Sequence, residues 1–434
     1  MSQGNTAPET LPSKRQPYDF EYEIVPQTAR KRWYVITLIW VAMGLDISGL
    51  FLGTFLSSGL LFPQAVGATL IGSALLGVIA ALCANVGHGC GVSTTLLCIS
   101  VFGRLGGKLI GLIAALSLLG WFAFQLDFFG MMLQKALLHY QFDPGRLPIL
   151  IFGMTLMALT AIWGVSALGK LSMFSVPLMM ILIVSGIVAA AGVQGSPPLM
   201  AVKAPISMGA AISYVVSIWI VAAVMAPDIA RYAKTRHDAL LGAGLGFFFG
   251  NSATILVALI LARLVGSDNL IEIFFSIGLG ISAIVVLILA QWTTNSGNLV
   301  SAALGLSVVV RGLPRPVLVL LLAVAGLLLA RNGMVHNFTP FLSLLGVLIS
   351  PVAGVYLVEY YVWGASRLMQ NAPQLSSLNP TAMAAWCGGS GVSLLTSPDF
   401  FNLLTMTTVS SLDGILVGMV IYGLWGRPRP AVHQ

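Results

Sequence analysis

Long apolar stretches recur along the whole chain and constrain its fold more than any other feature. A stretch of about 17–25 apolar residues is long enough to cross the hydrocarbon core of a bilayer as an α-helix. Only 8% of the residues are charged and 57% are hydrophobic, which is not the balance of a soluble globular domain. We therefore predict an all-α polytopic protein embedded in the lipid bilayer. Twelve transmembrane helices are expected, near residues 34–57, 64–87, 106–134, 147–166, 170–193, 208–226, 239–264, 273–296, 315–332, 339–363, 380–397 and 405–425.

Basic residues gather at alternate ends of these expected spans. With the N-terminus inside, sixteen Lys and Arg residues fall on the cytoplasmic side and five on the other. This bias predicts a plasma (inner) membrane protein with both termini in the cytoplasm, including an N-terminal segment 1–33 without a cleavable signal and a tail 426–434. The basic residues form no stripe, so the net charge of +7 does not indicate nucleic acid as a partner. The sequence gives no signal for an oligomeric state.

The first expected span is interrupted by polar and flexible residues. Gly44 and Gly49 flank Asp46 near the middle of the membrane, where a continuous helix is weakened. An unwound segment there exposes backbone carbonyls and half-helix ends, which bind ions and polar solutes. The alternative is a kinked but continuous helix in which Asp46 bonds to a neighbouring helix.

The third and sixth spans each carry a tryptophan near mid-membrane. Trp121 and Gln125 are four residues apart and share one helix face, a pairing that suits a flat, hydrogen-bonding ring. Trp219 occupies the corresponding place in the sixth span, so two indoles are expected to sandwich the ring. Asp127 lies about 120° from Trp121 around the helix, which leaves a functional role and a bond to a neighbouring helix equally open.

The eighth span ends in a polar stretch, Gln291 to Asn298, where a membrane helix normally carries leucines. Lipid offers no hydrogen bonds, so such a cluster is expected to face a cavity, a partner helix or a solute. The hydroxyls of Thr293 and Thr294 are hard oxygen ligands suited to small cations. The alternative is that both bond back to carbonyls of the preceding turn and that Asn295 caps the helix.

Other motifs are expected to have structural roles. Gly242, Gly246 and Gly250 recur every fourth residue, which predicts close helix packing. Asp228 and Arg231 favour an ion pair at a helix end. The roles of two further acidic residues, Glu359 and Asp413, stay open. No nucleophile with a base, phosphate loop or metal-ligand spacing is evident, so we do not expect an enzyme.

Several short motifs, in the same order, resemble the nucleobase:cation symporter-1 family, and most closely its cytosine permease branch. They are Val25-Pro26-Gln27-Thr28-Ala29-Arg30-Lys31 before the first span, Phe249-Gly250-Asn251-Ser252 in the seventh and Trp292-Thr293-Thr294-Asn295 in the eighth. The similarity extends over about residues 24–365. It implies a five-plus-five inverted repeat, with broken first and sixth spans, formed by 34–193 and 208–363. Spans eleven and twelve, 380–425, would be additional.

The resemblance also implies site residues. A co-transported sodium ion would lie between carbonyls of the first span and oxygens of the eighth, at Gly44, Ile47, Ala290, Thr293 and Thr294. Trp121 and Trp219 would hold the ring, and Asn295 would contact the base. Ser48, in the interrupted span, is added to the expected substrate-binding residues.

The chain departs from the cytosine permease pattern at several positions. Leu118 stands where those permeases have glutamine, Trp219 where they have phenylalanine, and Gln125 is similar to the hydantoin-transporter arrangement. Asp46 and Asp127 depart as well, and they leave open either recognition of a substrate amino group or proton coupling.

The resulting hypothesis is a secondary symporter that imports a planar nucleobase, cytosine or a related heterocycle, with sodium. The alternative is a proton-coupled carrier of a related heterocycle such as hydantoin, allantoin or a thiamine-precursor pyrimidine. A passive channel would need a continuous polar stripe on several spans, and the polar groups instead form clusters at mid-membrane.

Overall fold

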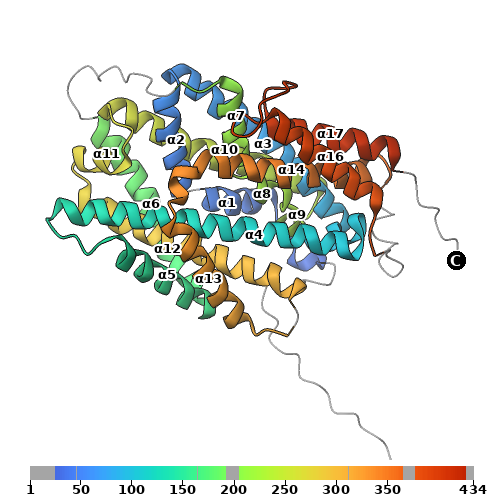
Figure 1. The fold of residues 1–434 in the computed structure, drawn as a ribbon, viewed down its shortest axis with the longest axis horizontal. Helices are drawn as coiled ribbons and strands as arrows, with labels where there is room; N and C mark the ends of the chain where they lie inside the picture. The colour runs from blue at the N-terminus through green and yellow to red at the C-terminus, as the bar shows by residue number, and fades with distance from the viewer. Residues whose placement is uncertain are drawn as a thin grey trace, which may run out of the picture.

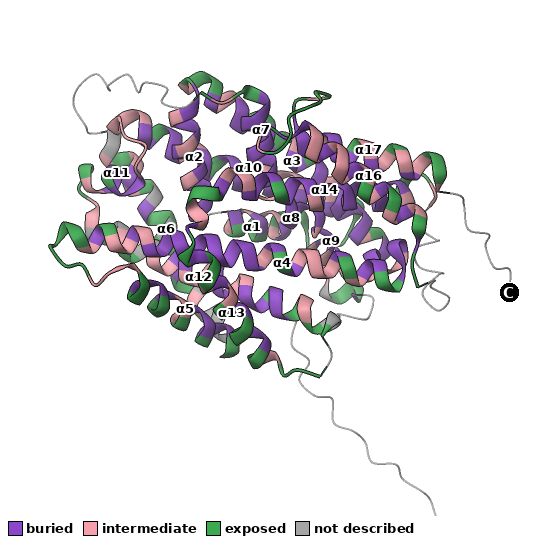
Figure 2. Cartoon of the chain, in the orientation of Figure 1, coloured by how far each residue is buried: buried purple, intermediate pink, exposed green. Residues whose placement is uncertain are grey.

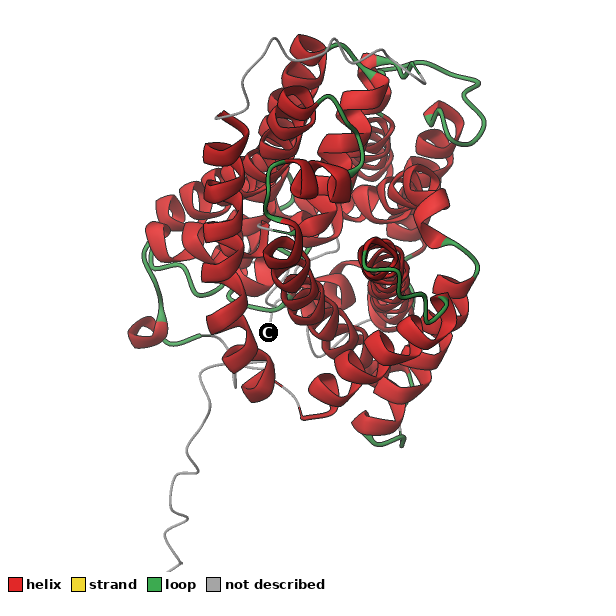
Figure 3. Ribbon diagram, turned by 90° about the vertical axis from the view of Figure 1, so that its left-hand side faces the viewer, coloured by secondary structure: helices red, strands yellow, loops and turns green. Residues whose placement is uncertain are grey.

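The computed structural model describes residues 25–44, 46–163, 165–191, 205–310, 312–364 and 377–426. Most of the predicted N-terminal segment (1–24) and the tail from 427 to 434 lie outside these residues. Within them the protein is helical (Figure 3). One isolated β-bridge in the described chain pairs Lys31 with Ala233. The helices are α1 (Trp33–Gly44), α2 (Ile47–Gly59), α3 (Phe62–Cys90), α4 (Thr94–His139), α5 (Arg146–Trp163), α6 (Val165–Ala191), α7 (Met208–Ser217), α8 (Ile220–Val224), α9 (Pro227–Ala230), α10 (Arg236–Val265), α11 (Leu270–Ser276), α12 (Gly280–Val309), α13 (Arg315–Arg331), α14 (Phe338–Tyr361), α16 (Pro380–Thr396) and α17 (Ser410–Trp425), with 3-10 turns η1 (Gln27–Ala29) and η2 (Met334–Asn337).

Five helical segments of the described chain are long and apolar enough to cross a membrane by themselves. They are α3, α4, α5, α10 and the segment Met334–Tyr361, which joins η2 to α14. The pair α1 and α2 passes the same test as one broken span, with the two axes 62° apart. Exposed positions lie mainly on the outer faces of peripheral helices such as α5 and α13 (Figure 2). The all-α polytopic architecture is confirmed, whereas twelve spans and an inverted repeat stay predictions.

Helix ends follow local sequence signals. α3 ends at Gly91, whose φ of 68° suits a residue without a Cβ. α4 begins after Ser93, whose side chain accepts from the Leu96 amide. α10 begins with a capping box between Thr235 and Asp238. These short-range bonds fix where the long helices enter and leave the bundle.

The glycine stripe of α10 forms the contact surface for α1. A Cβ at Gly242 would lie 2.8 Å from the side chain of Ile36, and one at Gly246 would lie 2.5 Å from Trp40. A Cβ at Gly250 would lie 3.2 Å from the backbone of α1. The predicted packing role of the stripe is therefore confirmed, and it holds α1 close enough for the α1–α2 break to rest on α10.

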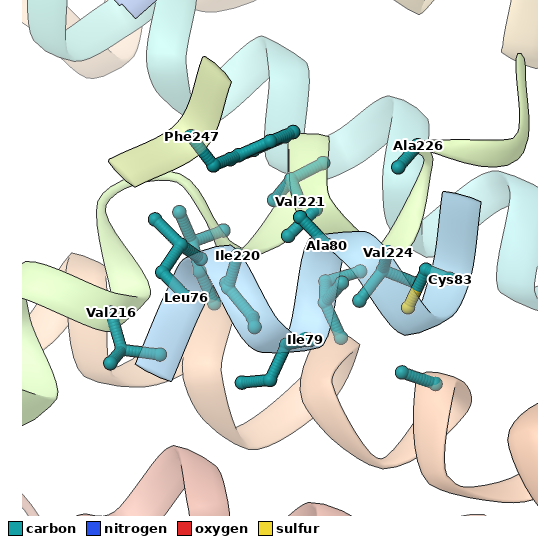
Figure 4. Packing of buried hydrophobic residues seen from close by; sticks show 14 of the residues in the cluster. Leu76, Ile79, Ala80, Cys83, Val216, Ile220, Val221, Val224, Ala226 and Phe247 are labelled. Carbon is teal, nitrogen blue, oxygen red and sulfur yellow. The ribbon is translucent and has the colours of Figure 1, made fainter. Parts of the chain in front are cut away.

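The sixth expected span is divided. α7 ends at Ser217, α8 begins at Ile220, and Trp219 lies between them with φ −120° and ψ 11°. Both pieces pack on α3 through buried apolar side chains (Figure 4), among them Leu76, Ile79, Ala80 and Cys83 of α3 and Val216, Ile220, Val221 and Val224 of the divided span. The interruption therefore leaves Trp219 at the junction of two helices that α3 holds in place.

α4 and α12 form an antiparallel pair through the middle of the protein. α4 is 46 residues long and bends at Gly103, where φ is 83° (Figure 1). The two helices approach closely at Gly305, because a Cβ there would lie 3.2 Å from that of Ala115. Further along, the Asn295 amide donates to the Phe122 carbonyl. This pair supports the polar groups described below.

The last two helices pack on α14 at one edge of the molecule (Figure 1). Two serine pairs also join α17 to α7, with Oγ–Oγ distances of 3.0 Å between Ser213 and Ser410 and 2.7 Å between Ser217 and Ser411. α16 and α17 thus brace both α14 and the first half of the divided span.

Candidate functional site

Three buried polar side chains meet where α1 gives way to α2. Asp46 has extended backbone angles (φ −116°, ψ 147°) and precedes the first turn of α2, and Ser48 lies in that turn. The Gln125 amide of α4 donates to the Ser48 hydroxyl at 3.2 Å and lies 3.4 and 3.5 Å from the Asp46 carboxylate oxygens. Gln125 is 1% exposed, and its Oε1 has no hydrogen-bond partner in the described chain. The structure therefore brings together the predicted first-span and third-span residues.

Aromatic rings surround this cluster on the α4 side. Trp121 packs edge-on against Phe341 of α14, with ring centroids 5.2 Å apart and planes at 80°. It also meets Phe124 edge-on at 5.8 Å. The sequence interpretation missed Phe341. Its signal was the pair of phenylalanines, Phe338 and Phe341, three residues apart at the start of the tenth expected span.

The second indole has a different neighbour. Trp219 packs edge-on against Phe247 of α10 at 6.0 Å, and it is only partly buried. The ring contacts of the described residues do not include one between Trp219 and Trp121. Each indole is thus held by its own phenylalanine.

The backbone carbonyl of Gly44, a predicted cation ligand, already accepts two hydrogen bonds. It accepts from the Asp46 backbone N–H at 2.8 Å and from the Thr254 hydroxyl of α10 at 2.8 Å. Thr254 was not among the predicted residues. The other predicted first-span ligand, Ile47, lies with Ala290 of α12 in one buried cluster. The two spans predicted to share a cation therefore do come together at this level.

Thr293, the first residue of the predicted hydroxyl pair of α12, lies beside α6. The Thr293 hydroxyl bonds back to the Leu289 carbonyl at 2.7 Å, as the alternative interpretation of this pair anticipates. It also lies 2.8 Å from the Ser175 hydroxyl of α6, a residue that the sequence interpretation missed. Thr294 is half-buried. A hydroxyl oxygen that has made such bonds keeps acceptor capacity for a cation.

Asn295 is directed into the scaffold. Its fully buried amide nitrogen donates to the Phe122 carbonyl at 3.0 Å and contacts the Met157 sulfur at 3.3 Å. Its Oδ1 accepts from Asn298 at 3.4 Å. The resemblance placed this amide on the base, whereas the structure joins it to α4 and α5, because a buried amide takes the nearest carbonyl.

Asp127 is likewise part of the scaffold. Its buried carboxylate forms an ion pair with Arg146 at the start of α5 and accepts from the Val335 backbone N–H at 2.8 Å. Of the two interpretations left open for this residue, a bond to a neighbouring element is the one that the structure shows.

The remaining acidic residues support helix ends. The carboxylate of Asp228 accepts from the Thr94 backbone at the start of α4 at 2.6 Å, and the Arg231 guanidinium donates to the Asp228 carbonyl at 3.1 Å. Glu359 accepts from the Tyr422 hydroxyl of α17 at 2.6 Å. Asp413 accepts from the backbone and hydroxyl of Thr407.

A cavity of about 50 Å³ opens between α4, α12 and the end of α8. On α4 it extends to Leu118, which lies one turn before Trp121. Its walls are mostly small side chains, and Lys108 is its one charged residue; the lining residues are Thr95, Ile99, Gly107, Lys108, Gly111, Ala114, Ala115, Leu118, Met225, Ser301 and Gly305. The charge pattern of the sequence predicts that this end of α4 faces the cytoplasm.

Sequence comparisons identify relatives over most of the chain. Residues 24–397 match the family described as permease for cytosine/purines, uracil, thiamine, allantoin. This match includes α16 and so extends beyond the limit near residue 365 that the motifs indicated. The cytosine permease of Escherichia coli strain K12 is 30% identical over 350 residues, which cover 80% of this chain and 81% of that protein. The purine-uracil permease NCS1 of Arabidopsis thaliana is 25% identical over 83% of this chain and 66% of its own length.

Solved structures share the fold. Mhp1, a nucleobase-cation-symport-1 family transporter with bromovinylhydantoin bound, superposes with a TM-score of 0.74 and 20% identity over 94% of both chains. A manganese transporter mutant from Eremococcus coleocola gives a TM-score of 0.54 and 13% identity over 94% of this chain and 97% of that one. The relatives named here are transporters and not enzymes. The chain therefore belongs to the nucleobase:cation symporter-1 family of membrane permeases, close to the cytosine permeases.

Proposed function

We propose that this permease imports a planar nucleobase, cytosine or a related pyrimidine or purine heterocycle, by symport with sodium across the plasma (inner) membrane. The observation that carries the proposal is the bond between Gln125 and Ser48 beside Asp46, at the buried break between α1 and α2. Buried polar groups at that depth are costly in lipid, and in transporters they mark substrate and ion pathways.

Trp121 and Trp219 would supply the flat surfaces for the ring. Stacking on an aromatic side chain is worth about 1–3 kcal/mol per base. Trp121 lies one turn from Gln125 on the same face of α4, so one helix would offer both a plate and an amide. Trp219 is at the junction of α7 and α8, where a small change in backbone angles moves the indole.

Ser48 and Gln125 would read the ring edge. For Asn295 we propose a supporting role, because its amide is bonded to Phe122 and Met157. In that role it keeps α12 against α4, and so keeps the α4 residues in register with the break.

Sodium would bind between the break and α12, at the oxygens of Gly44, Ile47, Ala290, Thr293 and Thr294. This all-oxygen set suits a hard cation. Support comes from the buried cluster that Ile47 and Ala290 share. Both lone pairs of the Gly44 carbonyl are engaged, so the ion would replace the Thr254 hydroxyl there.

Ion and base binding would then assist each other. A cation that ties the end of α1 to α12 fixes the same break that presents Ser48 and Asp46 to the base. By linkage, the base must raise the affinity for sodium by the same factor.

Proton coupling is the second candidate, and one observation favours it. Asp46 is buried, and in the described chain its carboxylate accepts hydrogen bonds from neutral groups of Gln125, Ser48 and Ile47, with no basic group among the ion pairs at this site. A carboxylate in such surroundings can exchange a proton during transport. Asp127 is less suited to this role, because Arg146 neutralises it.

Competitive uptake tests both candidates. The protein is reconstituted in vesicles, and uptake of labelled cytosine is competed with unlabelled cytosine, uracil, hypoxanthine, allantoin, hydantoin and a thiamine-precursor pyrimidine. Each competition is run with a sodium gradient, with a proton gradient and with neither. Accumulation that requires sodium supports the proposal, accumulation that follows the proton gradient alone supports the second candidate, and equilibration without accumulation contradicts both.

A further inference from the structure

Gln291 of α12 is buried, and its side chain makes no hydrogen bond with the part of the chain that the structure describes. It is 1% exposed, and within the described chain neither its Oε1 nor its Nε2 has a partner. A buried polar group left unpaired costs about 1–3 kcal/mol, and native proteins rarely keep one without a reason. Both ends of one amide are affected here, and neither the sequence motifs nor the proposed cation set uses this side chain.

The neighbours of Gln291 on α12 show which way it faces. Ala290 packs in the cluster that contains Ile47 and Leu50 of α2. Asn295 bonds to Phe122 of α4. Gln291 lies about 100° from Ala290 and about 40° from Asn295 around the helix, so it faces the seam between α2 and α4.

The residues at which α4 and α12 meet show how deep in the membrane Gln291 lies. Asn295 meets Phe122, and Gly305 meets Ala115, so the two helices run antiparallel. Gln291 is one turn before Asn295, and Gln125 is about one turn after Phe122. Both steps lead in the same direction from the Asn295–Phe122 contact, and they place Gln291 at the level of Gln125 and the α1–α2 break.

Gln125 has the matching feature, because its own Oε1 is also without a partner while its Nε2 is held by Ser48 and Asp46. Within the described chain, both glutamines thus have free amide atoms at the level of the α1–α2 break. Together they leave two amide oxygens, which accept, and one amide NH₂ group, which donates.

We propose that Gln291 is a specificity-determining residue that, with Gln125, binds the hydrogen-bonding edge of the transported heterocycle. The complementary edge has an N–H donor next to an acceptor, which is either a cis-amide (N–H beside C=O) or an amino group beside an unprotonated ring nitrogen. A second N–H group of the ring meets the Gln125 oxygen. This inference rests on the proposed function, and it narrows the substrate to neutral heterocycles with such an edge.

The test compares Gln291→Met, which keeps the length of the side chain and removes its polar atoms, with wild type and with Gln64→Met. Gln64 is an exposed glutamine in the first turn of α3 and is the matched control. Uptake is measured in vesicles for the base that wild type transports best and for each of its singly N-methylated isomers. Sodium binding is followed separately, as the increase in melting temperature caused by sodium without base.

Gln291→Met should raise the KM for the base about tenfold, the loss expected for one or two neutral hydrogen bonds. At least one N-methylated isomer should show the same KM in wild type and variant, because its methyl group already blocks the edge. Folding and the sodium-induced increase in melting temperature should be unchanged in Gln291→Met. Gln64→Met loses an exposed bond to the Leu61 backbone and should match wild type in KM and in the sodium-induced increase in melting temperature.

An unchanged KM in a folded Gln291→Met protein overturns the inference and leaves the proposed function intact. A sodium effect lost in Gln291→Met also overturns it, because the amide would then serve the cation. So does an equal loss for every isomer, which indicates general damage. If Gln291→Met does not fold, Gln291→Asn, which retracts the amide by one methylene, is judged by the same criteria. Wild-type vesicles that take up no base on the panel defeat the proposed function itself, and this inference with it.

Discussion

The Thr254 hydroxyl donates to the Gly44 carbonyl at 2.8 Å, at the residue where α1 ends. The same carbonyl accepts from the Asp46 backbone at 2.8 Å, so both of its lone pairs are used. The carbonyl proposed as a cation ligand is thus held by a side chain from a third helix, α10. Thr254 and sodium would compete for one oxygen.

Replacing Thr254 with valine tests this competition. Thr254→Val keeps the shape of the side chain and frees one lone pair of Gly44, so the sodium concentration for half-maximal uptake should fall severalfold. Loss of the bond should lower stability without sodium by about 0.5–1.5 kcal/mol. Thr155→Val is the control, because the Thr155 hydroxyl bonds only within α5 on an exposed face. A half-maximal sodium concentration equal to that of wild type would contradict the competition.

Breaking the ion pair between Asp127 and Arg146 should lower the stability of the protein without changing which ion drives transport. Removing one partner of a fully buried pair costs about 3–5 kcal/mol, and less is expected here because Arg146 is 37% exposed. Asp127→Asn and Arg146→Gln should each lower the melting temperature, and the double variant should lose less than the two single losses combined. The dependence of uptake on pH and sodium should match wild type in all three. If the pH dependence of uptake changed in Asp127→Asn alone, Asp127 would take part in proton coupling.

The variant Asp46→Asn distinguishes sodium coupling from proton coupling. The asparagine oxygen can still accept from Gln125, so the cluster should persist, while the group can no longer exchange a proton. Under sodium symport, the variant should keep sodium-driven accumulation with a modestly raised KM. Under proton coupling, accumulation driven by a pH gradient should disappear while exchange of internal for external base continues. Uptake and exchange measured in the same vesicles distinguish these results.

Replacing the aromatic residues proposed to stack on the base should weaken uptake to different degrees. Trp121→Ala and Trp219→Ala should each raise the KM for the base by about 5- to 150-fold, which takes saturation out of the usual concentration range, because one aromatic face is worth about 1–3 kcal/mol and about 1.4 kcal/mol is a tenfold change. Trp121→Phe should retain part of the affinity. Phe341→Leu should have a smaller effect than Trp121→Ala, because Phe341 packs nearly perpendicular to the indole and is expected to act on the base through Trp121. Near-normal uptake by both tryptophan-to-alanine variants would contradict the proposal that the two indoles sandwich the ring.

Features that depend on one helix were predictable from the sequence. Two glycines around Asp46 indicated the interruption between α1 and α2, and the four-residue spacing of Trp121 and Gln125 placed them on one face. The glycine stripe of α10 indicated a close contact for the same reason. In each case the signal is a helical period or a weakened helix, and both are local properties.

Features that depend on which helices meet were not predictable. Thr254 contacts Gly44 across 210 positions of sequence, and Phe341 contacts Trp121 across a similar distance. A helical wheel gives the angle of Asn295 but not the neighbour at that angle, and that neighbour proved to be the Phe122 carbonyl. Whether Gln291 has a partner in the described chain depends likewise on the side chains of the helices around α12, and the sequence does not give their positions.

The cavity between α4 and α12 predicts that the protein releases its substrate along this path. Ser301 is exposed on the cavity wall, so a cysteine there should react with a membrane-impermeant thiol reagent applied from the Lys108 end of α4. The background for Ser301→Cys is Cys387→Ser, because Cys387 is exposed, whereas Cys83, Cys90 and Cys98 are buried.

Binding of base and sodium should slow this labelling severalfold, because a carrier that closes around its substrate must narrow the path from Leu118 outward. Ser307→Cys is the matched control, since Ser307 is exposed on the same helix outside the cavity and its labelling should not respond to substrate. Labelling of Ser301→Cys from the opposite side only would reverse the predicted orientation. A labelling rate that stays constant with sodium and base would mean that this cavity does not close during transport and is not the release path.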